Sequence, residues 1–249
     1  MGYHEEYRKL WVNSGYPGDM GSACAVKPPP KEFRPAYHFT EVDHAISNIE
    51  NARMKVTRIL ETNDPFELAG LNAAHPRVRR EIEKFKNEND KNLRLLCFSK
   101  DWRSPALWAH YANRHMGICL GFWAKPETLL DVTYHRDRID AGFTSAAPVV
   151  FTPKIKELLI TAKARDWYYE EEIRRCVPLA QTFESMGIRF YHFDETLKLR
   201  EVILGAKCTT KIDDVCALVR TKYKDVAVYK ARPAFGYFKM VPHESTIPK

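Results

Sequence analysis

Apolar and polar positions along the chain follow two different periods, which indicates a mixture of strands and helices. The nearly continuous apolar runs at 93–99 and 117–123 are typical of strands buried on both faces of a sheet. Apolar residues at helical spacing predict helices over 42–49 and 212–222, and a basic amphipathic helix over 76–87. Because strands and helices do not alternate with a regular β-α-β period, we expect an α+β fold with mixed or antiparallel central sheets and flanking helices.

Shorter elements fill the space between these segments. A Ser-Pro pair at 104–105 resembles a helix start and predicts a helix over 106–112, and apolar spacing predicts another over 153–165. The segment 168–179 alternates as an extended strand would, which places Glu170, Glu172 and Arg174 on one face. The remaining strand candidates are short and rich in aromatic or apolar residues: 36–39, 54–59, 132–134, 190–193, 201–204, 225–229 and 237–241.

The beginning of the chain lacks such periodicity. Residues 1–32 carry several glycines and a run of three prolines, with a possible short helix over 5–12. This composition favours an arm or linker over a packed element. We therefore expect an N-terminal arm over 1–32 and a single α+β domain over 33–249.

Composition and charge limit the classes of partner. The net charge of +7 favours a polyanionic partner such as nucleic acid or a nucleotide, although the basic residues are spread along the whole chain. Six cysteines without a Cys-x-x-Cys pair sit largely in apolar runs, so we expect buried free thiols and no metal. Without a long apolar stretch or a signal-peptide pattern, the sequence predicts a cytoplasmic protein with no membrane segment.

Several common catalytic signatures are missing from the sequence. It contains no Gly-x-Gly-x-x-Gly, no phosphate-binding Gly-Lys-Ser/Thr loop, no His-Glu-x-x-His and no Gly-x-Ser-x-Gly. Rossmann dehydrogenases, P-loop enzymes, zincins and ordinary serine hydrolases are thereby excluded by signature. A nucleophilic cysteine-histidine pair stays open.

The pair Glu170 and Glu172 is the most informative candidate site. The two carboxylates share one strand face and come directly after the aromatic residues Trp167, Tyr168 and Tyr169. One carboxylate could orient a ligand while the other stabilises charge. The alternative is a solvated strand face on which Arg174 neutralises both glutamates.

A second candidate segment surrounds the end of the 93–99 strand. Ser99 stands at this end and could hydrogen-bond a ligand, while His110 and Tyr111 of the following helix could face the same cleft. The alternative is that the aromatic residues of the helix only pack it on the sheet.

Several motifs occur in an order that resembles the bacterial family named domain of unknown function 2971. They extend over about residues 37–241 and comprise Asn63-Asp64-Pro65-Phe66-Glu67, Cys97-Phe98-Ser99, Leu107-Trp108-Ala109-His110-Tyr111-Ala112, His115-x-Gly117-x-Cys119-Leu120-Gly121-Phe122, Trp167-x-Tyr169-Glu170-x-Glu172-x-Arg174 and Glu201-Val202-Ile203-Leu204-Gly205. The layout of this family is similar to that of ADP-ribosyltransferases, with an early aromatic strand, a strand ending in serine before a tyrosine-bearing helix, and a late Glu-x-Glu.

The resemblance implies NAD as substrate. In such a transferase, Tyr37, His38, Ser99 and Tyr111 would shape the dinucleotide site. Glu172 would hold a ribose hydroxyl and stabilise the positive charge that develops as the glycosidic bond breaks, and Glu170 would orient the acceptor. The expected setting is a toxin or phage-defence effector acting on nucleic acid or protein. A non-catalytic nucleic-acid- or protein-binding module, in which the same motifs only build the core, is the alternative.

Overall fold

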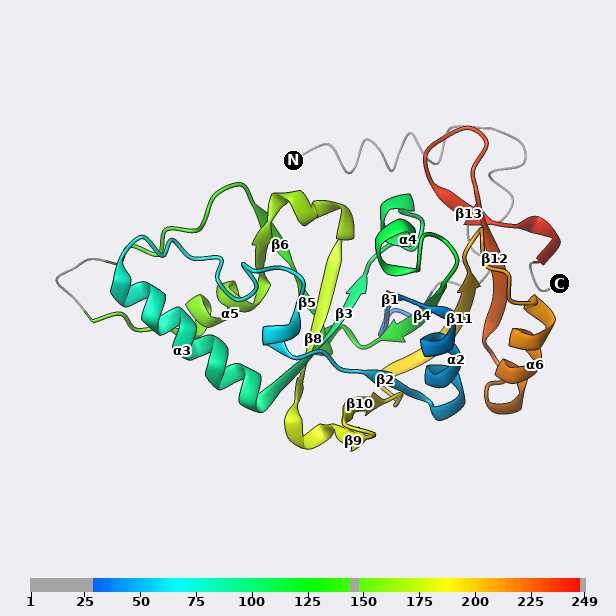
Figure 1. Cartoon of the computed structure of the whole chain (residues 1–249), viewed down its shortest axis with the longest axis horizontal. Helices are drawn as coiled ribbons and strands as arrows, with labels where there is room; N and C mark the ends of the chain where they lie inside the picture. Colours follow the sequence, from blue (N-terminus) through cyan, green and yellow to red (C-terminus); the bar gives the residue numbers. More distant parts are fainter. Residues whose placement is uncertain (1–28, 144–147, 247–249) are drawn as a thin grey trace.

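A mixed eight-stranded sheet runs through the computed structural model, which describes residues 29–143 and 148–246 (Figure 1). Its order is β13-β12-β11-β4-β1-β3-β8-β5, and β11 and β12 are the parallel pair among otherwise antiparallel neighbours. The expected α+β class is confirmed. The strands are β1 (Arg34–Thr40), β3 (Leu93–Ser99), β4 (Ile118–Ala124), β5 (Leu130–Asp131), β8 (Glu172–Pro178), β11 (Leu197–Leu204), β12 (Ala227–Pro233) and β13 (Met240–Pro242).

Helices cover both faces of this sheet (Figure 1). Helices α2 (Val42–Asn51) and α6 (Ile212–Lys222) share one apolar core with alternate residues of β4 and β11. The intervening residues of those strands pack instead with α4 (Pro105–Tyr111). Burial on both faces is the physical reason for the continuous apolar runs. A third core joins β3 to α3 (Pro76–Asn92) and α5 (Pro153–Thr161).

Two small sheets and five 3-10 helices complete the described part of the chain. One small sheet has the order β2-β10-β9 and the other pairs β6 with β7 in parallel. Their strands are β2 (Arg53–Lys55), β6 (Thr133–His135), β7 (Ala162–Ala164), β9 (Phe183–Ser185) and β10 (Ile188–His192). The 3-10 helices are η1 (Ile59–Glu61), η2 (Pro126–Thr128), η3 (Arg165–Glu170), η4 (Leu179–Gln181) and η5 (Glu244–Thr246).

The strand expected over 168–179 is wrong in its first part. Strand β8 begins only at Glu172, because residues 165–170 form η3 and Glu171 adopts a left-handed φ of 43°. The backbone N–H of Glu171 donates to the Tyr168 carbonyl and closes the turn. Glu170 therefore does not lie on a strand face with Glu172, although Glu172 and Arg174 do share β8.

Other boundaries shift for local reasons. The strand expected over 54–59 is limited to β2, and the helix expected over 153–165 ends at Thr161, where β7 takes over. The basic helix continues beyond residue 87 to Asn92. The predicted arm over 1–32 lies outside the described residues up to residue 28, as does the helix over 5–12.

Two further properties concern the described residues as a group. None of the helices within 29–143 and 148–246 is long and apolar enough to cross a membrane. The five cysteines in those ranges are free thiols, and two of them, Cys119 and Cys208, are buried.

Candidate functional site

A cavity of about 220 Å³ opens beside the place where β1 meets β3. These strands pair at a single position, Tyr37 with Ser99, whereas β1 pairs along its whole length with β4 and β3 with β8. In place of a backbone ladder, the His38 ring reaches the Cys97 carbonyl, with 3.3 Å between Nδ1 and the oxygen. The cavity is lined by the six residues to which the family resemblance gives a role: Tyr37, His38, Ser99, Tyr111, Glu170 and Glu172.

Three of these residues come from one row across the sheet. Glu172 pairs with Ser99, and Ser99 pairs with Tyr37. The row continues through Gly121 of β4 to Glu201 of β11. Directly opposed residues point to the same face of a sheet, so this row aims its side chains at the face that α4 covers.

Buried ion pairs connect the two predicted glutamates to each other. The Lys163 ammonium donates to a Glu170 carboxylate oxygen and to Glu172 Oε2, the latter over 2.9 Å. Arg174 donates from Nε to Glu172 Oε1 over 3.0 Å and from Nη2 to Oε2 over 2.8 Å. Lys163 therefore brings the end of η3 and the start of β8 together, and the two glutamates share a site although they do not share a strand.

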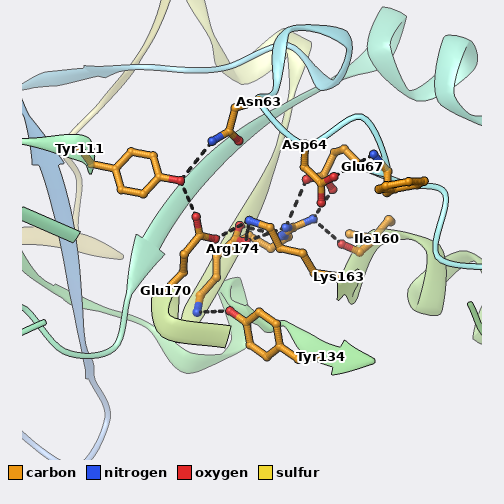
Figure 2. Close-up of polar contacts among 11 residues, drawn as sticks. Asn63, Asp64, Glu67, Tyr111, Tyr134, Ile160, Lys163, Glu170 and Arg174 are labelled. Atoms are coloured by element: carbon orange, nitrogen blue, oxygen red, sulfur yellow. Dashed lines mark hydrogen bonds and ion pairs between the residues drawn. The ribbon is translucent and has the colours of Figure 1, made fainter. Parts of the chain in front are cut away.

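A third glutamate comes from the loop before α3. Arg174 Nη1 donates to Glu67 Oε1 over 2.5 Å and to the Ile160 carbonyl over 2.6 Å (Figure 2). Asp64 lies beside Glu67 and accepts from the Phe66 backbone N–H over 2.8 Å, which fixes the turn of this loop (Figure 2). With all groups ionised, three glutamates face two cations, so the cluster carries one negative charge in excess.

The Tyr111 side chain has a partner of its own in this cluster. Its hydroxyl donates to Glu170 Oε1 and accepts from Asn63 Nδ2 over 3.1 Å (Figure 2). The same ring packs at the edge of the core beneath α4. The two interpretations of Tyr111, packing and polar contact, thus describe two ends of one side chain.

Burial and ion pairing set the protonation of the cluster. Burial alone would raise the pKa of Glu172, but the charges of Arg174 and Lys163 outweigh it and hold this pKa below its usual value. Burial likewise opposes the charge of Lys163, yet Glu172 and Glu170 raise the Lys163 pKa. At neutral pH the Glu172 carboxylate and the Lys163 ammonium are therefore both charged.

The cysteine and histidine beside the cavity are neutral. Burial raises the pKa of the Cys97 thiol far above its usual value, and the Glu172 carboxylate raises it further. Burial lowers the pKa of His38. A thiolate-imidazolium pair is consequently disfavoured, and the charged groups of the cavity are its carboxylates and Lys163.

The remaining predicted residues have different surroundings. The Ser99 hydroxyl donates to the Asp101 carbonyl over 3.0 Å and accepts from the Asp101 N–H over 3.2 Å, so its proton is committed to the turn after β3. His110 and Trp167 are not among the described residues that line the cavity. The Lys163 ammonium nevertheless lies 5.0 Å from the centre of the Trp167 ring.

The alternative of a solvated strand face is wrong. Glu172 is 4% exposed and Arg174 is 0% exposed. Removing one partner of a charge pair at this depth destabilises the fold, because the other charge stays buried without compensation.

Four residues of the site were not assigned a role from the sequence: Asn63, Glu67, Lys163 and Glu201. Glu67 and Arg174 are 107 positions apart, and no periodicity connects them. Glu201 accepts from the Tyr229 hydroxyl over 2.8 Å, and burial raises its pKa. In the sequence, Glu201 could have been noticed as a single charged residue at the start of an apolar run.

Comparison of the chain with protein-family models, curated proteins and solved structures finds no match. The family resemblance therefore stays a prediction. No group of three or more histidine, cysteine or acidic residues within 29–143 and 148–246 is arranged to hold a metal ion. The function has to be argued from the cavity and its charges.

Proposed function

We propose that the cavity binds the nicotinamide-ribose half of NAD and that the chain transfers the ADP-ribosyl group to an acceptor. The observation that carries this proposal is the buried Glu172 carboxylate in a cluster of three glutamates with two cations, at the wall of a cavity lined by Tyr37 and Tyr111. Such a cluster favours a ligand that is cationic or becomes cationic during reaction. NAD meets both conditions, because its nicotinamide ring is charged and its ribose becomes cationic when the ring leaves.

The reaction breaks the bond between the nicotinamide nitrogen and the ribose C1 atom. Both bonding electrons go to nicotinamide, which leaves as a neutral ring, and positive charge develops on the ribose. An acceptor nucleophile then forms the new bond to C1 and loses its proton to solvent or to a nearby base. A fixed carboxylate lowers the barrier because it stabilises the cationic transition state more than the ground state.

Glu172 is suited to this role because it is held but not saturated. Its Oε1 accepts from Arg174 Nε over 3.0 Å, and a carboxylate oxygen can accept more than one hydrogen bond. A ribose hydroxyl could therefore bond to Oε1 without displacing Arg174. The two donors of Arg174 keep the carboxylate in one orientation, as preorganised electrostatic stabilisation requires.

Glu170 and the cavity walls complete the proposed site. Glu170 receives hydrogen bonds from Tyr111 and Lys163, one on each oxygen, and each oxygen retains a lone pair for an acceptor group. Tyr37, Phe39 and Leu107 supply flat and apolar surface for a ring. The cavity is smaller than the roughly 300–1,000 Å³ of pockets that hold whole drug-sized ligands, so it suits one half of the dinucleotide.

The test is incubation of the whole chain with NAD labelled in its adenylate part, with and without a cell extract. The proposal expects release of nicotinamide, transfer of label to a macromolecule in the extract, and saturable NAD binding by calorimetry. The alternative, a non-catalytic binding module, expects none of the three. Absence of both NAD binding and nicotinamide release would contradict the proposal.

A further inference from the structure

Two further cavities continue from the wall of the candidate site. One of about 150 Å³ shares Lys163 with the candidate site and is also lined by Phe66, Ala69 and Arg138. A larger one of about 430 Å³ shares Ala69 and Arg138 with it and extends along α3. We call these two cavities the basic groove. Since successive cavities share lining residues, the groove runs from the Lys163 side chain to the long helix drawn at the left of Figure 1.

The charge of the groove is opposite to that of the candidate site. Arg79, Lys86, Arg136 and Arg138 line it, against Glu83 and Asp137. Within the described part of the chain, none of these four cations forms an ion pair with a carboxylate. Arg79 and Lys86 are two turns apart on α3, so along this helix the cations extend over about 10 Å.

An aromatic ring stands exposed among these cations. The Phe66 side chain is 48% exposed, and the Arg138 guanidinium lies 4.9 Å from the centre of its ring. Leu60, which is 51% exposed, adds apolar surface at the larger cavity. Cations that can follow a chain of phosphates, combined with an exposed ring on which a base can stack, form the combination that single-stranded nucleic acids require.

We propose that the basic groove binds a single-stranded nucleic acid. Its phosphates would lie against Arg79, Lys86, Arg136 and Arg138, and one base would stack on Phe66. An acidic peptide would satisfy the same charges but would leave the Phe66 ring without a flat partner. The inference does not depend on NAD chemistry, because it concerns binding alone. If both proposals hold, the strand lies beside the cavity in which the ADP-ribosyl group is released.

The experiment measures binding of a fluorescent single-stranded oligonucleotide of about 20 nucleotides, long enough for one site, by anisotropy across a salt series without NAD. The double variant Lys86→Ala/Arg138→Ala should weaken binding on the order of tenfold at 0.1 M salt and reduce the slope of log affinity against log salt by about 1.4, since each phosphate contact to a single strand contributes about 0.7. The control Lys211→Ala/Lys224→Ala removes the same charge from exposed positions around α6.

The aromatic contribution is tested separately. Phe66→Ala should weaken binding on the order of tenfold with the salt slope unchanged, because stacking releases no counterions. The exposed Met186→Ala serves as its control and should leave binding unchanged.

Four outcomes would overturn the inference. They are no binding by the unmodified chain, equal weakening by the two double variants, competition by polyglutamate as effective as by unlabelled oligonucleotide, and displacement of the oligonucleotide by ADP-ribose. The last would assign the groove to the dinucleotide. Glu172→Gln should bind the oligonucleotide normally, so failure of the transferase proposal and failure of this one are distinguishable.

Discussion

Arg174 is the residue on which the candidate site depends most. It is 0% exposed and bonds two glutamates, Glu67 and Glu172, that come from distant segments. Arg174→Met keeps much of the side-chain volume but removes the cation bonded to Glu67 and leaves Glu172 with Lys163. We expect the free energy of unfolding to fall by about 3 to 5 kcal/mol, measured by urea denaturation at pH 7.

The matched control is the exposed pair of Arg34 and Asp131. Its guanidinium nitrogen and carboxylate oxygen are 2.9 Å apart, but the side chains are 32% and 47% exposed. Arg34→Met should therefore cost no more than about 1 kcal/mol. Equal losses in the two variants would show that the Arg174 cluster contributes no more than a surface ion pair.

Glu201 provides a pH-dependent prediction of opposite sign to that of an ordinary ion-paired glutamate. Burial raises its pKa in the folded chain, with the Tyr229 and Tyr37 hydroxyls as its bonded partners. Below the unfolded pKa of about 4.3, both states are protonated and the group has no effect on stability. As pH rises from the unfolded pKa to the folded pKa, the carboxyl ionises more readily in the unfolded chain, because burial penalises the charge in the folded chain. Its destabilising effect therefore grows over this range and is complete above the folded pKa.

Glu201→Gln removes this penalty, because the amide is neutral at every pH and can still accept from Tyr229. The difference in unfolding free energy between variant and unmodified chain should therefore shift in favour of the variant from pH 4 to pH 8. Denaturant titrations at several pH values measure it. A difference that stays constant with pH, or moves toward the unmodified chain as pH rises, would contradict the assignment.

At the scale of elements, the row across the sheet depends on Gly121. A Cβ atom there would lie 2.8 Å from Glu201 Oε2, 2.9 Å from Glu201 Cβ and 3.0 Å from Tyr37 Cε1. We expect Gly121→Ala to cost about 1 to 3 kcal/mol, since the packed neighbours must move. Because the nearest contact is the Glu201 carboxylate, combination with Glu201→Ala should recover part of that cost in a double-mutant cycle of unfolding free energies. Additivity within about 0.5 kcal/mol would show that the row is not in contact at this point.

The elements also show how far the apolar pattern determines the fold. Strand β3 and helix α6 have the bounds expected from the sequence, because a strand buried on both faces and a one-sided helix have clear periods. The pattern failed at 168–171, where alternating residues resemble a strand. There the ion pair of Glu170 with Lys163 and the left-handed Glu171 favour a 3-10 helix over extension of β8.

The candidate site could be predicted in part. The sequence singled out six residues that line one cavity, and the late glutamates stood out by their spacing. The contacts that organise them could not be predicted, since they depend on strand register and on tertiary ion pairs. Glu67, brought to Arg174 by the loop before α3, is the clearest example.

At the scale of the whole molecule, strands from both halves of the chain alternate in one sheet. β3 pairs with β8, and β4 pairs with β11. We expect limited proteolysis to cut before Phe33 first and to leave a stable core of about residues 33–245. Cleavage between residues 143 and 148 should leave two fragments that co-elute in gel filtration, because both sheet pairings join them. Separation of the fragments without denaturant would indicate two independent domains.

The central claim is that the Glu172 carboxylate stabilises a cationic transition state of NAD cleavage. Glu172→Gln should leave the fold intact, since Arg174 keeps Glu67 and Lys163 keeps Glu170. Asp90→Asn is the matched control, because Asp90 is also buried and paired with an arginine but does not line the cavity.

The deciding measurement is the rate of nicotinamide release at saturating NAD, together with the NAD dissociation constant from calorimetry, for these two variants and the unmodified chain. We predict that Glu172→Gln lowers the rate by about 100- to 1,000-fold, as loss of one preorganised charge-stabilising group does, while NAD binding stays within a few-fold and Asp90→Asn keeps the original rate. A folded Glu172→Gln chain that releases nicotinamide at the unmodified rate would contradict the claim.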